Sequence, residues 1–246
     1  MKIHLSILII ALAHVLTPSA FAEFSPWLLP TVQRSGNASS HAADGFFGGD
    51  GPSPSFASDS VGLLAPSTLS SSTSTGGSSA SVSYDYSSVA SFSSTDLFLS
   101  VDVTNAVYSA TRAPVGDALF AAESSVIYQF HSDTPFLWSI SASLQPAFDL
   151  NVYGYISLSN SSNQIFSWFD TLGVNSGTDG GMLPAGDSAV TGNIGTGGQA
   201  PLNGTTIAGT FSGSYSFSAS AVPEPSTGLL LAGAGLGLLL RRRRAN

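Results

Sequence analysis

The chain has 246 residues, of which only 9% are charged, and it contains no cysteine. The missing cysteines exclude disulfides, thiolate catalysis and cysteine-based metal sites. The net charge is −8, and without the two ends the remaining 2 Lys/Arg and 14 Asp/Glu give 2 − 14 = −12. Such a body lacks the clustered Lys and Arg that nucleic acid requires, so we expect no nucleic-acid partner.

The first 22 residues have the pattern of a secretory signal peptide. Lys2 precedes an apolar segment from Ile3 to Val15, and Ala20-Phe21-Ala22 forms a small-x-small cleavage site before Glu23. We expect export by the Sec machinery and cleavage by signal peptidase at the site that Ala20 and Ala22 define.

Residues 23–80 are expected to form a Ser/Gly-rich arm that is disordered in part. From Ser35 onward this segment is dominated by Ser, Gly, Ala, Thr and Pro, and it contains turn sequences such as Gly48-Gly49-Asp50-Gly51-Pro52. Its small apolar surface offers little to offset the entropy cost of ordering.

Residues 81–221 alternate between apolar and polar, which predicts antiparallel strands with one buried face. The clearest examples are Phe148 to Leu158 and Phe211 to Ala219. Gly, Asn and Ser turns separate such segments, as in β-sandwiches. We therefore expect an all-β, antiparallel β-sandwich ectodomain, with a jelly roll as one candidate topology. A terminal signal helix is expected at each end of the chain.

Two segments of this body are expected to differ from the strands around them. Gly116 to Ser125, around Ala118-Leu119-Phe120, is a candidate helix or a connection between strands. Thr171 to Thr205 is rich in glycine and is expected to be a long loop, with one strand near Ala189 to Ile194.

The body offers few residues for catalysis, so we expect no enzyme and no catalytic residue. Lysine is absent after Lys2, and neither a Gly-x-Ser-x-Gly elbow nor a His-Glu-x-x-His motif occurs. After signal removal the histidines are His41, in the arm, and His131, which we place in a strand-end turn beside Ser132 and Asp133. A secreted hydrolase stays an alternative, with a Ser/His site or a carboxylate pair drawn from Asp149, Asp170 and Asp179.

No cofactor is expected, with calcium kept as an alternative. Asp179 with Asp187, and Asp102 with Asn105, would supply oxygen ligands, although no twelve-residue EF-hand loop is present.

A carbohydrate-binding module is a further alternative. Tyr153 and Tyr155 alternate outward from the strand at Phe148 to Leu158, and aromatic rings stack on flat ligands. The competing interpretation is that these tyrosines cover the second face of the sandwich.

The last segment, residues 222–246, has three parts. Val222, Pro223, Glu224 and Pro225 come first, a run of Gly, Ala and Leu extends from Gly228 to Leu240, and Arg241, Arg242, Arg243 and Arg244 follow. As a helix the apolar run spans roughly 20 Å, less than the roughly 30 Å of a hydrocarbon core, which favours a transient span. The arginines would hold its end on the cytoplasmic side.

These parts, in this order, resemble the PEP-CTERM sorting signal of Gram-negative bacteria. The resemblance covers residues 222–246 and implies cleavage near Pro223-Glu224-Pro225 by an exosortase, a membrane-embedded protease. It further implies a surface or extracellular destination, commonly in species that make exopolysaccharide, and the short apolar run predicts that anchoring in the inner membrane is transient. Leu183-Pro184-Ala185-Gly186 fits the Leu-Pro-x-Gly turn often found in such proteins. We therefore expect a structural or adhesive protein linked to exopolysaccharide or biofilm.

Overall fold

The structure is a computed structural model that describes residues 31–44, 47–50, 55–59, 62–93, 95–145, 152–161, 163–170, 176–201 and 204–222. Within these ranges the chain forms strands and turns, and no helix long and apolar enough to cross a membrane is found. The expected signal peptide and the residues from Pro223 onward lie outside the described residues, together with the helices expected there.

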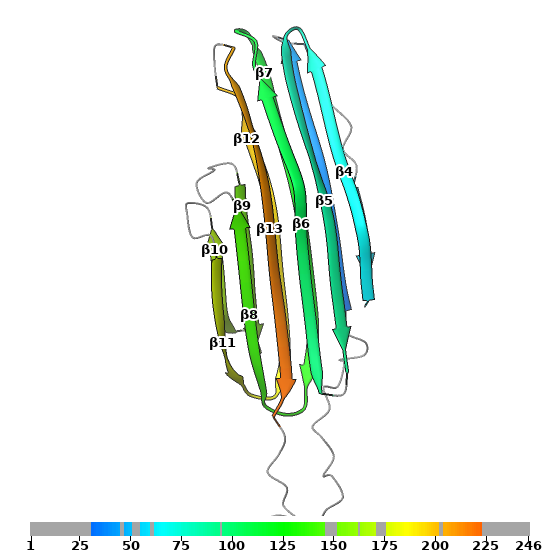
Figure 1. Ribbon diagram of the computed structural model, residues 1–246, viewed down its shortest axis with the longest axis vertical. Coiled ribbons are helices and arrows are strands. Elements are labelled where there is room, and N and C mark those ends of the chain that lie inside the picture. Colours follow the sequence, from blue (N-terminus) through cyan, green and yellow to red (C-terminus); the bar gives the residue numbers. More distant parts are fainter. Residues whose placement is uncertain are drawn as a thin grey trace, which may run out of the picture.

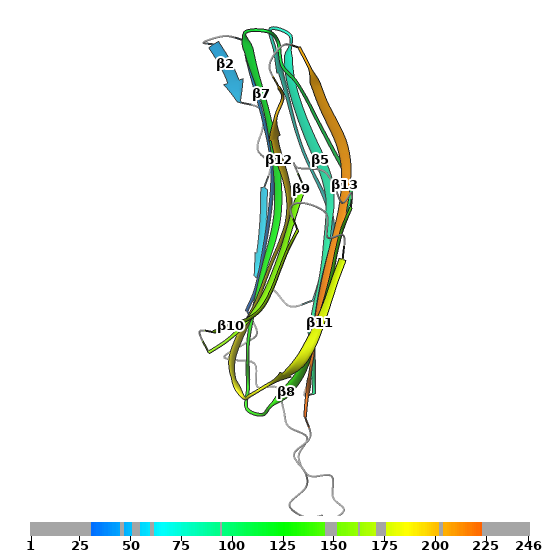
Figure 2. The same cartoon turned by 90° about the vertical axis from the view of Figure 1, so that its left-hand side faces the viewer.

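The strands form two antiparallel sheets that face each other as layers (Figures 1 and 2). We call the seven-stranded sheet A; its order is β10 (Asn163–Asp170), β9 (Val152–Asn160), β12 (Gly186–Gln199), β7 (Gly116–Ser132), β1 (Thr31–Asp44) and β2 (Phe47–Asp50), with β3 (Ser55–Asp59) also paired to β1. Sheet B has the order β11 (Ser176–Leu183), β8 (Phe136–Gln145), β13 (Thr206–Ala221), β6 (Asp96–Thr111), β5 (Ser78–Phe92) and β4 (Gly62–Thr75). The expected all-β sandwich is thus confirmed.

The last eight strands pair in a nested order. β6 pairs with β13, β7 with β12, β8 with β11 and β9 with β10, and these pairs alternate between sheet B and sheet A. This is the connectivity of a double-sheet jelly roll, one of the topologies considered from the sequence. The turn from β11 to β12 is Leu183-Pro184-Ala185-Gly186, in which Gly186 takes a φ of 136°, a conformation that favours glycine.

Alternation decides which side chains enter the core. In β13, Phe211, Tyr215 and Phe217 are buried, and the serines between them face outward. The same pattern buries Val126, Tyr128 and Phe130 in β7. Because successive side chains of a strand point to opposite faces, one face of each sheet builds the core and the other remains outside.

Two segments expected to lie outside the strands are long central strands. Gly116 to Ser125 begins β7, where Ala118, Phe120 and Ala122 are buried and the whole strand pairs with β1 and β12. The segment at Thr171 to Thr205 contains β11 and β12 rather than one short strand. Local composition suggested a helix and a loop, but pairing with distant strands overrides local preference.

The structure also differs from the expectation for the Ser/Gly-rich segment, which was predicted to be a partly disordered arm. Within residues 23–80, β1 pairs with β7 over fourteen residues and β4 pairs with β5, so the sandwich begins well before residue 81. β1 lies beside β7 in sheet A, and β5 and β4 extend sheet B beyond β6, so that these strands widen the jelly roll on one side. Small side chains suffice here because backbone pairing and contact between the sheets stabilise the strands together.

Both ends of the described body lie at the same end of the sandwich, which we call the terminal pole. Thr31, the first residue of β1, pairs with Gln129 near the end of β7, and Ala221, the last residue of β13, pairs with Phe136 at the start of β8. The turn Ser132 to Pro135 joins β7 to β8 between them. Figure 1 shows β13 ending at this lower end of the long axis.

Candidate functional site

The segment expected to be processed starts where the folded body ends. The Ala221 N–H donates to the Thr95 carbonyl at 2.9 Å, and the Val222 N–H donates to the Pro135 carbonyl at 3.0 Å. Val222 is thus fixed at the terminal pole, while Pro223, Glu224, Pro225 and Arg241, Arg242, Arg243 and Arg244 lie outside the described residues. The described body therefore ends at the residue that directly precedes Pro223 in the sequence.

The turn that holds Val222 is itself braced. Its Ser132 hydroxyl donates to the Thr134 carbonyl at 2.6 Å, and both residues are buried. His131, at the end of β7 as expected, contacts Asp187 of β12 through Nδ1 at 2.6 Å and Asp133 of the turn through Nε2 at 3.1 Å. The imidazole therefore ties the turn to sheet A. The Ser132 hydroxyl, the nearest in sequence, is bonded to the turn and not to the imidazole.

These contacts predict a pH dependence of stability. The hydrogen bond to Asp187, supported by Asp133, raises the pKa of His131 above its ordinary value of 6.5. A raised folded-state pKa contributes stability that is fully present below pH 6.5 and is lost as pH rises through the folded pKa. We expect the Tm difference between wild type and His131→Gln to be larger at pH 5.5 than at pH 8.5, measured by thermal unfolding. Asp187→Asn should reduce this pH dependence too, and an equal Tm difference at both values would contradict the prediction.

Three members of the predicted metal pairs, Asp179, Asp187 and Asn105, form hydrogen bonds with groups outside their pair. Asp179 lies in β11 of sheet B and accepts a bond from the Gly180 N–H at 2.8 Å, whereas Asp187 lies in sheet A. The Asn105 amide donates to Asp85 at 2.8 Å and not to Asp102. Among the described residues no group of three or more His, Asp or Glu could hold a metal ion. Of the predicted carboxylates, Asp149 lies outside the described residues, and Asp170 ends β10.

The two candidate sugar-stacking tyrosines lie half-buried on the outer face of sheet A. The Tyr153 ring covers Gly195 of β12 so closely that a Cβ on this glycine would lie 2.6 Å from the ring Cζ. Burial raises the pKa of Tyr153 to about 12. Tyr155 lies opposite Asn193 of the same strand. Tyr153 therefore covers part of the outer face of sheet A. This agrees with the alternative interpretation, in which the tyrosines cover the second face of the sandwich.

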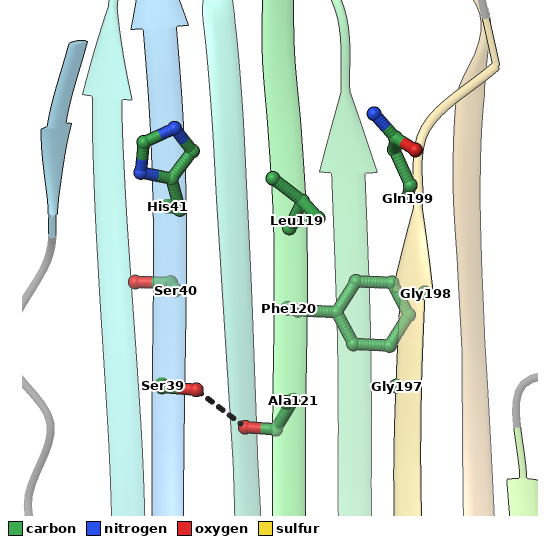
Figure 3. A pocket seen from close by; sticks show the side chains of 9 residues that line it. All are labelled: Ser39, Ser40, His41, Leu119, Phe120, Ala121, Gly197, Gly198 and Gln199. Carbon is green, nitrogen blue, oxygen red and sulfur yellow. Dashed lines mark hydrogen bonds between the residues drawn. The ribbon is translucent and has the colours of Figure 1, made fainter.

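A shallow depression of about 600 Å³ lies on sheet A, where β1, β7 and β12 run side by side (Figure 3). Ser39, Ala121 and Gly197 lie in register across these strands and carry some of the smallest side chains of the face. His41, Leu119 and Gln199 border it. Sequence reasoning missed this feature because it did not place the three strands side by side. Among the described residues that line it, His41 is the titratable one.

The outer face of sheet B carries rows of hydroxyl groups. We call the outward serines of β8 and β13 the hydroxyl face: Ser139, Ser141, Ser143, Ser212, Ser214, Ser216, Ser218 and Ser220. Neighbouring hydroxyls pair across the strands at 2.8 Å, Ser139 with Ser218 and Ser141 with Ser216. The signal for this face was the strict serine alternation after Phe211, but only the sheet order shows that the serines of β8 lie beside those of β13.

The described residues form a β-sandwich that ends at Val222, where the sequence resembling a sorting signal begins. Residues 221–244 match the family described as the PEP-CTERM protein-sorting motif, which confirms the resemblance seen in the sequence. The motif indicates exosortase-dependent sorting to the cell surface, with an exosortase as the processing partner. No curated protein matches the chain.

Proposed function

We propose that this protein is a non-enzymatic structural or adhesive component of the cell surface or extracellular matrix, which contacts exopolysaccharide through the hydroxyl face. The observation that carries the proposal is the combination of a surface-sorting motif with rows of outward serines on β13, the strand that the motif follows in sequence, and on its neighbour β8. The sorting motif follows β13, the same strand that supplies most of these serines.

The chemistry of this face suits a neutral polyhydroxylated polymer. A serine hydroxyl donates one hydrogen bond and accepts others, as a sugar hydroxyl does. The two arginines of the body lie elsewhere, Arg34 buried in β1 and Arg112 in the connection from β6 to β7. Each contact would be weak, but many contacts along one polymer add up through effective concentration.

The proposed route begins with Sec export and removal of residues 1–22 after Ala22. The tail then holds the protein in the inner membrane for a short time, with Arg241, Arg242, Arg243 and Arg244 on the cytoplasmic side. Processing near Pro223-Glu224-Pro225 releases the sandwich to the surface. The shared position of Thr31 and Ala221 at the terminal pole supports this route, because both connections to the membrane segments leave the same end of the body.

Two sets of substitutions separate sorting from adhesion. With Glu224→Ala and Pro225→Ala together, we expect an unprocessed precursor in the membrane fraction, seen by mass on immunoblots. With Ser141→Ala, Ser214→Ala and Ser216→Ala together, we expect normal processing but reduced retention in the polysaccharide fraction of the producing cells. The matched control on sheet A is Ser35→Ala with Ser125→Ala, a bonded pair of outward serines at 2.7 Å, which should leave retention unchanged.

The outcomes distinguish the alternatives. Unchanged retention in the hydroxyl-face variant would contradict the proposed contact, and normal processing of the Glu224 and Pro225 variant would contradict the proposed route. Loss of retention in Tyr155→Ala alone would favour the carbohydrate-binding module on sheet A instead.

A further inference from the structure

We propose that β4 is a self-association edge, through which two copies of this protein pair antiparallel and continue sheet B from one molecule into the next. This inference goes beyond polysaccharide contact and does not depend on it. In the described part of the chain β4 has a single strand neighbour, β5, and it lies at the outer border of the sheet in Figure 1. Among the described residues no strand pairs with the other side of its backbone, and an unpaired side is the requirement for strand addition.

Charge distinguishes β4 from the other edge strands. β2 contains Asp50, β3 contains Asp59, β10 contains Asp170 and β11 contains Asp179, whereas β4 contains no charged residue over its fourteen positions. A charged residue on an edge strand hinders pairing with another chain. In a body with a net charge of −12 the acidic edges repel their counterparts on a second copy, and β4 is the edge that lacks this protection.

The sequence of β4 is complementary to itself. Beyond the irregularity between Leu64 and Ser67, its regular part extends to Thr75. A two-fold axis at Ser71 would place Thr68 opposite Ser74 and Ser70 opposite Ser72 of the second copy. Such an isologous contact closes as a dimer. The outer row would then consist of hydroxyl pairs of the kind already present inside sheet B, where Ser139 meets Ser218 at 2.8 Å.

Contacts on the core-facing side of β4 hold this edge strand in place. The Ser71 hydroxyl, 3% exposed, bonds to the Ser40 hydroxyl of β1 at 2.7 Å, and Leu69 is buried in the core. On the outer face Thr68 donates to Asp85 of β5 at 2.5 Å, which fixes this carboxylate one strand away from the edge. A strand that is already ordered loses little further entropy when it pairs.

The test is the mass of the exported, processed chain in solution as a function of concentration, by sedimentation velocity. We expect a reversible monomer–dimer equilibrium for the wild type. Ser70→Asp with Ser72→Asp would place carboxylates opposite each other twice across the two-fold axis, and should weaken the dimer by about tenfold or more. The control, Ser109→Asp with Ser216→Asp, adds the same charge to outward positions of sheet B away from β4 and should dimerise more strongly than the edge variant.

A charge-swap experiment supplies the second readout. Ser70→Lys with Ser72→Lys should be monomeric alone and should form a heterodimer when mixed with Ser70→Asp, Ser72→Asp. Hydrogen exchange on the wild type needs no variant: amides of residues 67–75 should become more protected as concentration rises. A wild type that stays monomeric up to about 1 mM, or a dimer that keeps its affinity in the double-aspartate variant, would overturn the proposal.

Discussion

Phe130→Ala is expected to lower the free energy of unfolding by about 3–5 kcal/mol, the usual cost of removing a fully buried phenylalanine. Phe130 of β7 is 1% exposed, and its ring centroid lies 5.6 Å from that of Phe136 and 5.7 Å from that of Phe217. Both partners belong to sheet B, so this ring is part of the contact that holds the sheets together near the terminal pole. The alanine leaves a cavity that neighbouring strands cannot close without moving the sheets.

The measurement is chemical denaturation of the processed chain. Phe98→Ala provides the matched control, since this phenylalanine lies on the outer face of β6 and is 40% exposed. Its removal should cost no more than about 1 kcal/mol. Similar losses in the two variants would show that Phe130 does not have the core role that the structure assigns to it.

Gly192→Ala should destabilise the protein by about 1–3 kcal/mol, although it adds a single methyl group, because overpacking a core forces neighbours apart. Gly192 of β12 faces the core, and a Cβ at this position would lie 2.6 Å from Cε2 of the Tyr215 ring in the opposite sheet. Tyr215 is 3% exposed and its ring is enclosed, so it cannot swing away into solvent. The added methyl group would therefore push the two sheets apart at this position.

The control for this substitution is Gly197→Ala, five residues further along the same strand. The nearest atom to a Cβ there is the Phe120 carbonyl oxygen at 3.7 Å, an ordinary contact. Since alanine also restricts the unfolded chain, the variant should be as stable as wild type or more stable by up to about 1 kcal/mol. If both variants were destabilised equally, the cause would be a backbone requirement for glycine throughout β12. The space that Gly192 leaves for the Tyr215 ring would then not explain the loss of stability.

Strand alternation allowed much of the body to be predicted. Phe211, Tyr215 and Phe217 were assigned to one face, and all three are buried. Leu183 to Gly186 fits the Leu-Pro-x-Gly turn of the proteins that the tail resembles, and it joins β11 to β12. These assignments depend on neighbours within a few residues, and such short-range patterns are visible in a single sequence.

The predictions of secondary structure were wrong where pairing between strands distant in sequence decides the conformation. Ala118 to Ala122 has a composition that suits a helix as well as a strand, and its place between β1 and β12 makes it a central strand. A strand was predicted near Ala189 to Ile194 and the Gly-rich residues after it were assigned to a loop, but β12 continues to Gln199 and the ring of Tyr153 covers Gly195. A glycine facing an aromatic ring stabilises a sheet only when both are brought together by the fold.

The sorting destination follows from the tail sequence without any structure, because a linear motif is recognised as an ordered series of residues at the end of the chain. The hydroxyl face, the position of Val222 beside Pro135 and the uncharged outer edge of β4 required the tertiary structure. Each of these depends on which distant strands become neighbours. That choice is made by the summed burial and backbone pairing of the whole sandwich, and no local segment contains it.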